Sequence, residues 1–221
     1  MAYYEREAPK YFNLDKLGKN EESENALFYY SLFNSKAYEE DNAQEPTIEE
    51  IEQKIEYHIG IVGSNKKSSD AIIDEILSPG KDTVTCLLLA RRLRMKKFEV
   101  EPNFPYGGLE IDLFNNKEKI AIEIKRIYST NNFYRETIET SDKYARKKLK
   151  NKVLLLFLLP CKDDSHVKTI ERATIGFKSF IKDYKDKDKI IPQLDTFVCG
   201  FSEQSSLEEL SKRILGRINK G

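Results

Sequence analysis

Residues 107–125 have the sequence GGLEIDLFNNKEKIAIEIK, and this stretch decides the predicted fold. Apolar and polar residues alternate over 109–114 and again over 119–127, as they do in strands with one buried face. Asn115-Asn116-Lys117 lies between the two runs and is typical of a hairpin turn. The two strands are therefore expected to pair antiparallel, with Leu and Ile on one face and charged side chains on the other.

The charged face of this hairpin is the candidate site. Glu110 and Asp112 on the first strand are expected beside Glu123 and Lys125 on the second. Carboxylates on adjacent strands are hard oxygen ligands that suit Mg²⁺, and a nearby lysine can orient a nucleophile or stabilise charge on a phosphoryl group. The pattern predicts a site for phosphodiester hydrolysis, although a solvated ladder of charges produces the same pattern.

The elements around the hairpin are predicted from periodicity and turn signals. Their order indicates an α/β domain with a mixed sheet and helices on both faces. The last helix is expected to begin at Ser205 or Ser206 with two glutamates in its first turn. The expected elements are a helix over 83–97, an extended segment over 98–104, a turn at 105–108, a basic helix over 133–150, an apolar strand over 153–159, a helix over 165–184, a strand over 194–199 and a helix over 205–217.

Asp112, ten intervening residues and then Glu123-Ile124-Lys125 resemble the motif of the PD-(D/E)xK nuclease superfamily, and most of all its archaeal Holliday-junction-resolvase-type members. The order of elements over 82–159 is similar to the restriction-endonuclease-like αβββαβ core of that superfamily. The resemblance implies a DNA endonuclease that acts on duplex DNA or on branched DNA such as a Holliday junction. It implies Asp112 and Glu123 as metal ligands, Lys125 as the catalytic lysine, and Mg²⁺, which Mn²⁺ can replace, as the cofactor.

Resolvase-like members also carry a glutamate on the first core helix, and residues 83–97 contain no acid. Glu75, Asp82 or Glu110 is expected to take its place as a metal ligand. If none does, the same fold would serve a catalytically degenerate DNA-binding or assembly factor. A third alternative is a protein-interaction module that acts through the acidic N-terminal segment.

Two clusters of basic residues flank the motif and are expected to hold DNA phosphates. Tyr128, Tyr134 and Tyr144 are candidates for stacking on bases or for packing, and Phe133 is expected to pack. The expected DNA-binding residues are Arg91, Arg92, Arg126, Arg135, Lys143, Arg146, Lys147, Lys148 and Lys150.

Charge divides the 221-residue chain into an acidic and a basic part. Residues 1–60 hold 14 acidic and 6 basic side chains, whereas residues 61–221 hold 23 acidic and 31 basic. We expect an acidic, mainly helical extension over 1–60, a linker with a short helix over 61–81, and the nuclease-like domain over 82–221. Aromatic residues in the extension favour a role in dimerisation or in extending the core, and a homodimer is expected.

Composition excludes several classes of protein. The longest apolar run, 153–159, is too short to span a bilayer, and the N-terminus has no apolar signal core, so a cytoplasmic protein without a membrane partner is expected. Three cysteines without a C-x-x-C pair argue against a disulfide framework or a zinc site and predict buried thiols. Asn65 stands where a phosphate-binding loop needs its second glycine, so no nucleotide cofactor is expected.

Overall fold

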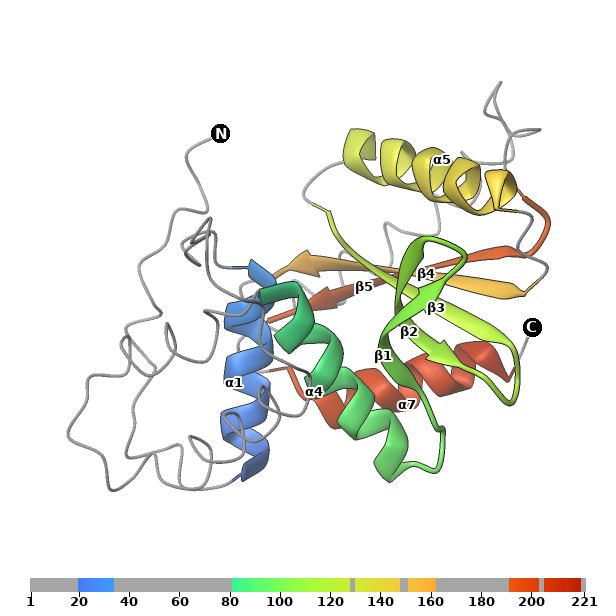
Figure 1. Cartoon of the computed structure of the whole chain (residues 1–221). Helices are drawn as coiled ribbons and strands as arrows, with labels where there is room; N and C mark the ends of the chain where they lie inside the picture. Colours follow the sequence, from blue (N-terminus) through green and yellow to red (C-terminus); the bar gives the residue numbers. More distant parts are fainter. Residues whose placement is uncertain are drawn as a thin grey trace, which may run out of the picture.

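The described residues form a five-stranded sheet with helices on both faces (Figure 1). The computed structural model describes residues 20–33, 81–127, 130–147, 151–161, 191–202 and 205–219. The strands are β1 (Glu101–Tyr106), β2 (Leu109–Asn115), β3 (Ile120–Arg126), β4 (Lys152–Pro160) and β5 (Leu194–Phe201). The helices are α1 (Asn20–Phe33), α4 (Lys81–Met95), α5 (Thr130–Arg146) and α7 (Leu207–Ile218).

The strands lie in chain order across the sheet. β1, β2 and β3 pair antiparallel, and β3, β4 and β5 pair parallel. The predicted α/β class with a mixed sheet is therefore confirmed. The helix predicted over 165–184, and residues 34–80 with most of the predicted linker, lie outside the described residues.

β4 is covered on both faces, as its unbroken apolar sequence predicts. Leu154, Leu156 and Leu158 pack with residues of α1, α4 and α7 on one face of the sheet. Leu155 and Phe157 point to the other face, where they pack with Phe133 of α5. All six residues are buried, so β4 fixes the middle of the sheet between the two layers of helices.

α1 belongs to the core of the domain rather than to a separate extension. Phe28 is fully buried, and its ring meets that of Phe201 in β5 at a centroid distance of 5.1 Å. Glu24, only 3 % exposed at its side chain, pairs with Arg91 at 3.2 Å and with Arg92 at 2.5 Å. The part of residues 1–60 that the structure describes therefore packs on α4, which agrees with the core-extension role.

The alternation predicted for β2 breaks at Asp112. Ile111 packs in the cluster on the α5 face, whereas Leu113 packs in the cluster on the α4 face. Residues two apart in a regular strand share a face, so the prediction that Leu109, Ile111 and Leu113 form one face is wrong. The reason is local: Asp112 has no paired residue in β1 or β3, both of which the structure describes completely.

The break in β2 lies opposite a kink in β1. Asn103 has a φ of 49° and stands between the pairs Pro102–Leu113 and Phe104–Ile111. Asparagine tolerates this left-handed conformation better than most residues. Here the β1–β2 ladder lacks one pair and keeps its register on either side, while the β2–β3 pairing ends at Leu113–Ile122.

Two ends of elements follow the sequence signals with small shifts. The turn between β1 and β2 consists of Gly107 and Gly108, with φ values of 55° and 79°, while the preceding two residues extend β1. Ser206 caps α7, because its side chain accepts a hydrogen bond from the Glu208 N–H at 3.1 Å. The predicted start of the last helix is thus confirmed.

The three cysteines are buried, as the sequence predicts. Cys86, Cys161 and Cys199 form no disulfide in the described structure. Among the described residues, no helix is both long and apolar enough to cross a bilayer.

Candidate functional site

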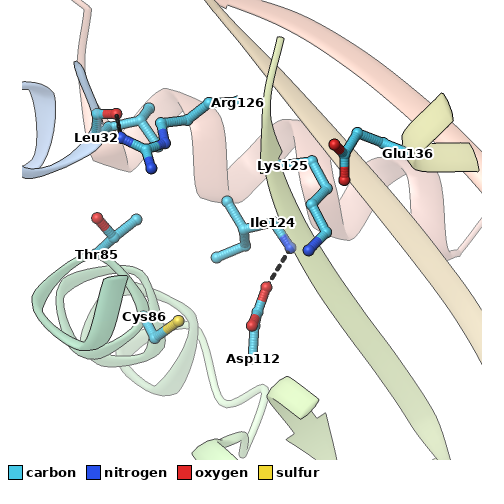
Figure 2. Close-up of a pocket in the computed structure, with 8 residues that line it drawn as sticks. All are labelled: Leu32, Thr85, Cys86, Asp112, Ile124, Lys125, Arg126 and Glu136. Atoms are coloured by element: carbon cyan, nitrogen blue, oxygen red, sulfur yellow. Dashed lines mark hydrogen bonds between the residues drawn. The ribbon is translucent and has the colours of Figure 1, made fainter. Parts of the chain in front are cut away.

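A pocket of about 260 Å³ opens where β2 separates from β3 (Figure 2). Asp112 and Lys125 line it together with Glu136 of α5, so three of the charged side chains around it come from three elements. The remaining lining residues are Leu32, Thr85, Cys86, Ile124 and Arg126.

Asp112 takes the place of a main-chain acceptor. The β2–β3 pairing ends at Leu113–Ile122, and beyond it the Ile124 N–H donates to Asp112 Oδ2 at 2.6 Å. Figure 2 shows this bond, with the carboxylate pointing from β2 to the backbone of β3. The side chain is thereby fixed at the mouth of the break in the sheet.

Glu123 is buried beside Asp112 and is held by α5. Its side chain is 1 % exposed, and its Oε1 accepts hydrogen bonds from the Tyr144 hydroxyl and from Lys143 Nζ, the latter at 3.2 Å. Burial and the adjacent Glu123 carboxylate raise the pKa of Tyr144, so the phenol keeps its proton and remains a donor. Oε2 accepts no hydrogen bond from the part of the chain that is described.

The two carboxylates repel each other. Burial, followed by the charge of Glu123, raises the pKa of Asp112 to about 7, although the Ile124 N–H and the charges of Lys125 and Lys143 act in the opposite direction. A raised pKa produced by burial together with a like charge is characteristic of functional carboxylate pairs. A cation at this position would relieve the repulsion.

Lys125 supplies positive charge to the same pocket. It follows Glu123 by two residues on β3, and its charge stabilises ionised Asp112. In Figure 2 its ammonium end lies on the side of the pocket that holds Asp112. The structure therefore brings Asp112, Glu123 and Lys125 together, which is the grouping that the sequence predicts.

The donor set fits a hard divalent cation with two protein carboxylates. No cluster of three Asp, Glu, His or Cys side chains suited to a metal occurs in the described segments. Mg²⁺ commonly binds through one or two carboxylates and retains several waters, so Asp112 and Glu123 suffice in number and type.

Of the three candidates for a third carboxylate, the structure describes the side chain of Glu110 alone. Glu110 is exposed and is not among the lining residues. Glu75 lies outside the described residues, and for Asp82 the structure describes only the backbone, in α4. α4 itself presents Thr85 and Cys86 to the pocket.

Arg91 and Arg92 of α4 form ion pairs within the fold, and their side chains are 40 % and 9 % exposed. Both pair with Glu24. Arg126 lines the pocket, and its Nη1 donates to the Leu32 carbonyl at 3.1 Å. Of the three arginines, Arg126 alone is therefore at the candidate site.

The basic residues of α5 are mostly exposed. Arg135 is 60 % and Arg146 is 76 % exposed at the side chain, and both form ion pairs with acids of the same helix. Lys147 is exposed just beyond α5. Lys143 instead turns inward to Glu123, and Lys148 and Lys150 lie outside the described residues.

The aromatic residues predicted to stack on bases or to pack differ in their exposure. Phe133 is buried, as expected, and packs on Phe157 at a centroid distance of 4.5 Å. Tyr144 is buried and bonded to Glu123, so in this structure it is not available for stacking on bases. Tyr134 is half-buried, and Tyr128 lies outside the described residues.

Sequence reasoning missed three residues of the site on α5: Glu136 as a pocket residue, and Lys143 and Tyr144 as partners of Glu123. Helical spacing contains the signal. Tyr144 is eleven residues after Phe133, which is three turns of helix and hence the same inward face.

Neither a family model, nor a curated protein, nor a solved structure matches the chain. The resemblance to PD-(D/E)xK nucleases therefore remains a prediction from the motif residues of the sequence.

Proposed function

We propose that the protein is a metal-dependent DNA endonuclease that hydrolyses phosphodiester bonds. The observation that supports this best is the position of Asp112, whose carboxylate accepts from the Ile124 N–H where β2 separates from β3. Buried Glu123 lies beside it, and Lys125 lines the same pocket. Such a site combines one carboxylate and a positive charge in the pocket with a second carboxylate buried beside it, an arrangement that suits phosphoryl transfer.

Each residue has a distinct role in the proposed reaction. Asp112 and Glu123 would hold Mg²⁺, which would polarise a phosphoryl oxygen and lower the pKa of a bound water. Lys125 offers its ammonium group to the phosphate or to the attacking water from within the pocket. Tyr144 and Lys143 keep Glu123 oriented through its Oε1.

The proposed substrate is DNA because α5, which lines the pocket through Glu136, also carries exposed arginines. Arg135 and Arg146 are exposed on α5, which also contributes Glu136 to the pocket. Their ion pairs lie at the surface, where such pairs contribute little and can be exchanged for phosphate contacts. A homodimer would bring two pockets to the two strands of a duplex or a four-way junction.

The direct test is cleavage of a supercoiled plasmid and of a four-way junction with Mg²⁺ or Mn²⁺. Asp112→Asn and Lys125→Met should each slow cleavage by about 10²-fold or more, as the loss of one electrostatic group at a transition state does. Asp142→Asn and Lys117→Met remove the same charges at exposed positions and should cut within about twofold of the wild type. Equal cleavage by all five proteins would contradict the proposal.

One observation favours a second candidate, a DNA-binding or assembly factor that does not cut. α4 presents Thr85 and Cys86 to the pocket, where resolvase-like nucleases have a glutamate on the first core helix. Calorimetry separates the two functions. If the wild type binds Mn²⁺ and Asp112→Asn does not, the nuclease is favoured. If the protein binds DNA tightly and in a salt-sensitive way but gives no heat with metal, the non-cutting DNA-binding factor is favoured.

A further inference from the structure

Lys143 connects three elements at the break in the sheet. From α5, its Nζ lies 3.2 Å from Glu123 Oε1 on β3 and 3.1 Å from the main-chain oxygen of Glu110 on β2. Its side chain is 31 % exposed, while that of its partner Glu123 is 1 % exposed. The partly exposed Lys143 side chain thus places its ammonium group against the buried Glu123 carboxylate.

The Lys143 ammonium group compensates the negative charge of the buried Glu123 carboxylate. Glu123 lies beside Asp112, and its negative charge disfavours the ionised form of Asp112. A buried carboxylate needs a compensating charge, and Lys143 forms the ion pair with Glu123. Lys143 therefore supplies, within hydrogen-bonding distance, part of the positive charge that a divalent cation would bring.

We propose that Lys143 is the resident counter-ion of the Asp112–Glu123 pair and that its ammonium group leaves Glu123 when a divalent cation binds. This inference rests on the proposed metal site. Lysine suits the role because its charge sits on a flexible four-carbon stem and its stem already reaches solvent.

Tyr144 makes the exchange feasible without loss of orientation. It is fully buried, and its hydroxyl donates to the same Oε1 as Lys143. When the ammonium group departs, the phenol still fixes the carboxylate. The released Lys143 lies one helical turn from Lys147, which is exposed, so it joins the basic side of α5.

Calorimetric titration with Mn²⁺ at pH 8, where protons compete least with the metal, tests the exchange. Lys143→Met removes the resident charge and should tighten Mn²⁺ binding by about tenfold, because the metal no longer displaces an ion pair. Lys147→Met removes the same charge one turn away and should change the affinity by less than about twofold. Lys143→Arg keeps a counter-ion and should not tighten binding.

A second measurement needs no variant. Reductive methylation of the wild type, followed by mass spectrometry, reports how accessible each lysine is. Adding Mn²⁺ should raise the methylation rate of Lys143 several-fold and leave that of Lys147 unchanged.

The outcomes separate this inference from the proposed function. Mn²⁺ binding that is equal or weaker in Lys143→Met, together with an unchanged methylation rate of Lys143, would overturn the counter-ion role and leave the metal site standing. The absence of metal heat from every protein, Lys143→Met included, would overturn both.

Discussion

Burial and the neighbouring Glu123 disfavour the ionised form of Asp112. Its pKa rises from 3.8 to about 7, first because of burial and then because of Glu123. The folded chain therefore holds the Asp112 proton more tightly than the unfolded chain does. Between about pH 4 and pH 7 the unfolded chain has lost this proton while the folded chain keeps it, so folding stability from this group falls as pH rises through that window.

Asp112→Asn should therefore stabilise the protein more at pH 8 than at pH 5. Asparagine has the same shape and can still accept from the Ile124 N–H, but it carries no charge. We expect Asp112→Asn to raise the unfolding free energy by about 1–2 kcal/mol more at pH 8 than at pH 5. This range is reduced for the partial exposure of the side chain. Urea denaturation at the two pH values measures the difference. Asp142→Asn, at an exposed position paired with Arg146, should show no such pH dependence, and parallel behaviour of the two variants would refute the assignment.

Tyr144→Phe tests the support of Glu123. The change removes one hydroxyl and leaves the buried carboxylate with Lys143 as its remaining donor in the described structure. Hydrogen bonds to charged groups contribute about 1.5–3 kcal/mol, and we expect a loss of that size in unfolding free energy. Tyr106→Phe, at a half-buried tyrosine near the end of β1, is the control and should cost less than about 0.5 kcal/mol. A loss no larger than that of the control would show that the phenol does not hold Glu123.

At the scale of elements, α1 decides how far the folded unit extends. It contributes Leu27, Phe28 and Leu32 to the same core as α4, α7 and the sheet. Ser31 adds a hydrogen bond to Thr85 of α4 at 2.9 Å, and Leu32 reaches the pocket. The acidic helix thus serves both the core and one wall of the candidate site.

Phe28→Ala measures this contribution. Truncation of a fully buried phenylalanine leaves a cavity, and we expect a loss of about 3–5 kcal/mol in unfolding free energy. The full chain should be used, with chemical denaturation as the measurement. Met95→Ala, at a side chain that is 66 % exposed, should stay within about 0.5 kcal/mol of the wild type. A cost below about 1 kcal/mol for Phe28→Ala would mean that α1 does not fold cooperatively with the rest.

The sequence predicts the elements well wherever a local pattern suffices. The hairpin of β2 and β3, the doubly covered β4 and the cap at Ser206 depend on periodicity and on single turns. The break at Asp112 was missed because alternation assumes an unbroken pleat, whereas here a side chain replaces a main-chain acceptor. The grouping of Asp112, Glu123 and Lys125 still holds, since Asp112 crosses to β3 through its carboxylate. The α5 partners of Glu123 depend on packing between distant segments, which spacing within β3 does not encode.

At the scale of the whole molecule, the most exposed of the described ion-paired arginines lie on α5, while exposed Lys212 lies on α7. Among the described residues, Arg91 and Arg92 on one face form ion pairs with Glu24 of α1. α5 on the other face keeps Arg135 and Arg146 exposed. A polyanion is therefore expected to approach from the α5 face, where α5 also contributes to the pocket.

The salt dependence of DNA binding tests this orientation. Each lysine or arginine that neutralises a phosphate adds about one to the slope of log affinity against log salt. Arg146→Gln should therefore weaken binding to duplex DNA and lower the slope by about 1. Lys212→Gln removes the same charge from α7, at a side chain 58 % exposed on the opposite face, and should leave the slope unchanged. Fluorescence anisotropy in EDTA measures DNA binding without cleavage. If the two variants give equal slopes, the DNA does not contact the α5 face through Arg146, and the proposed orientation is wrong.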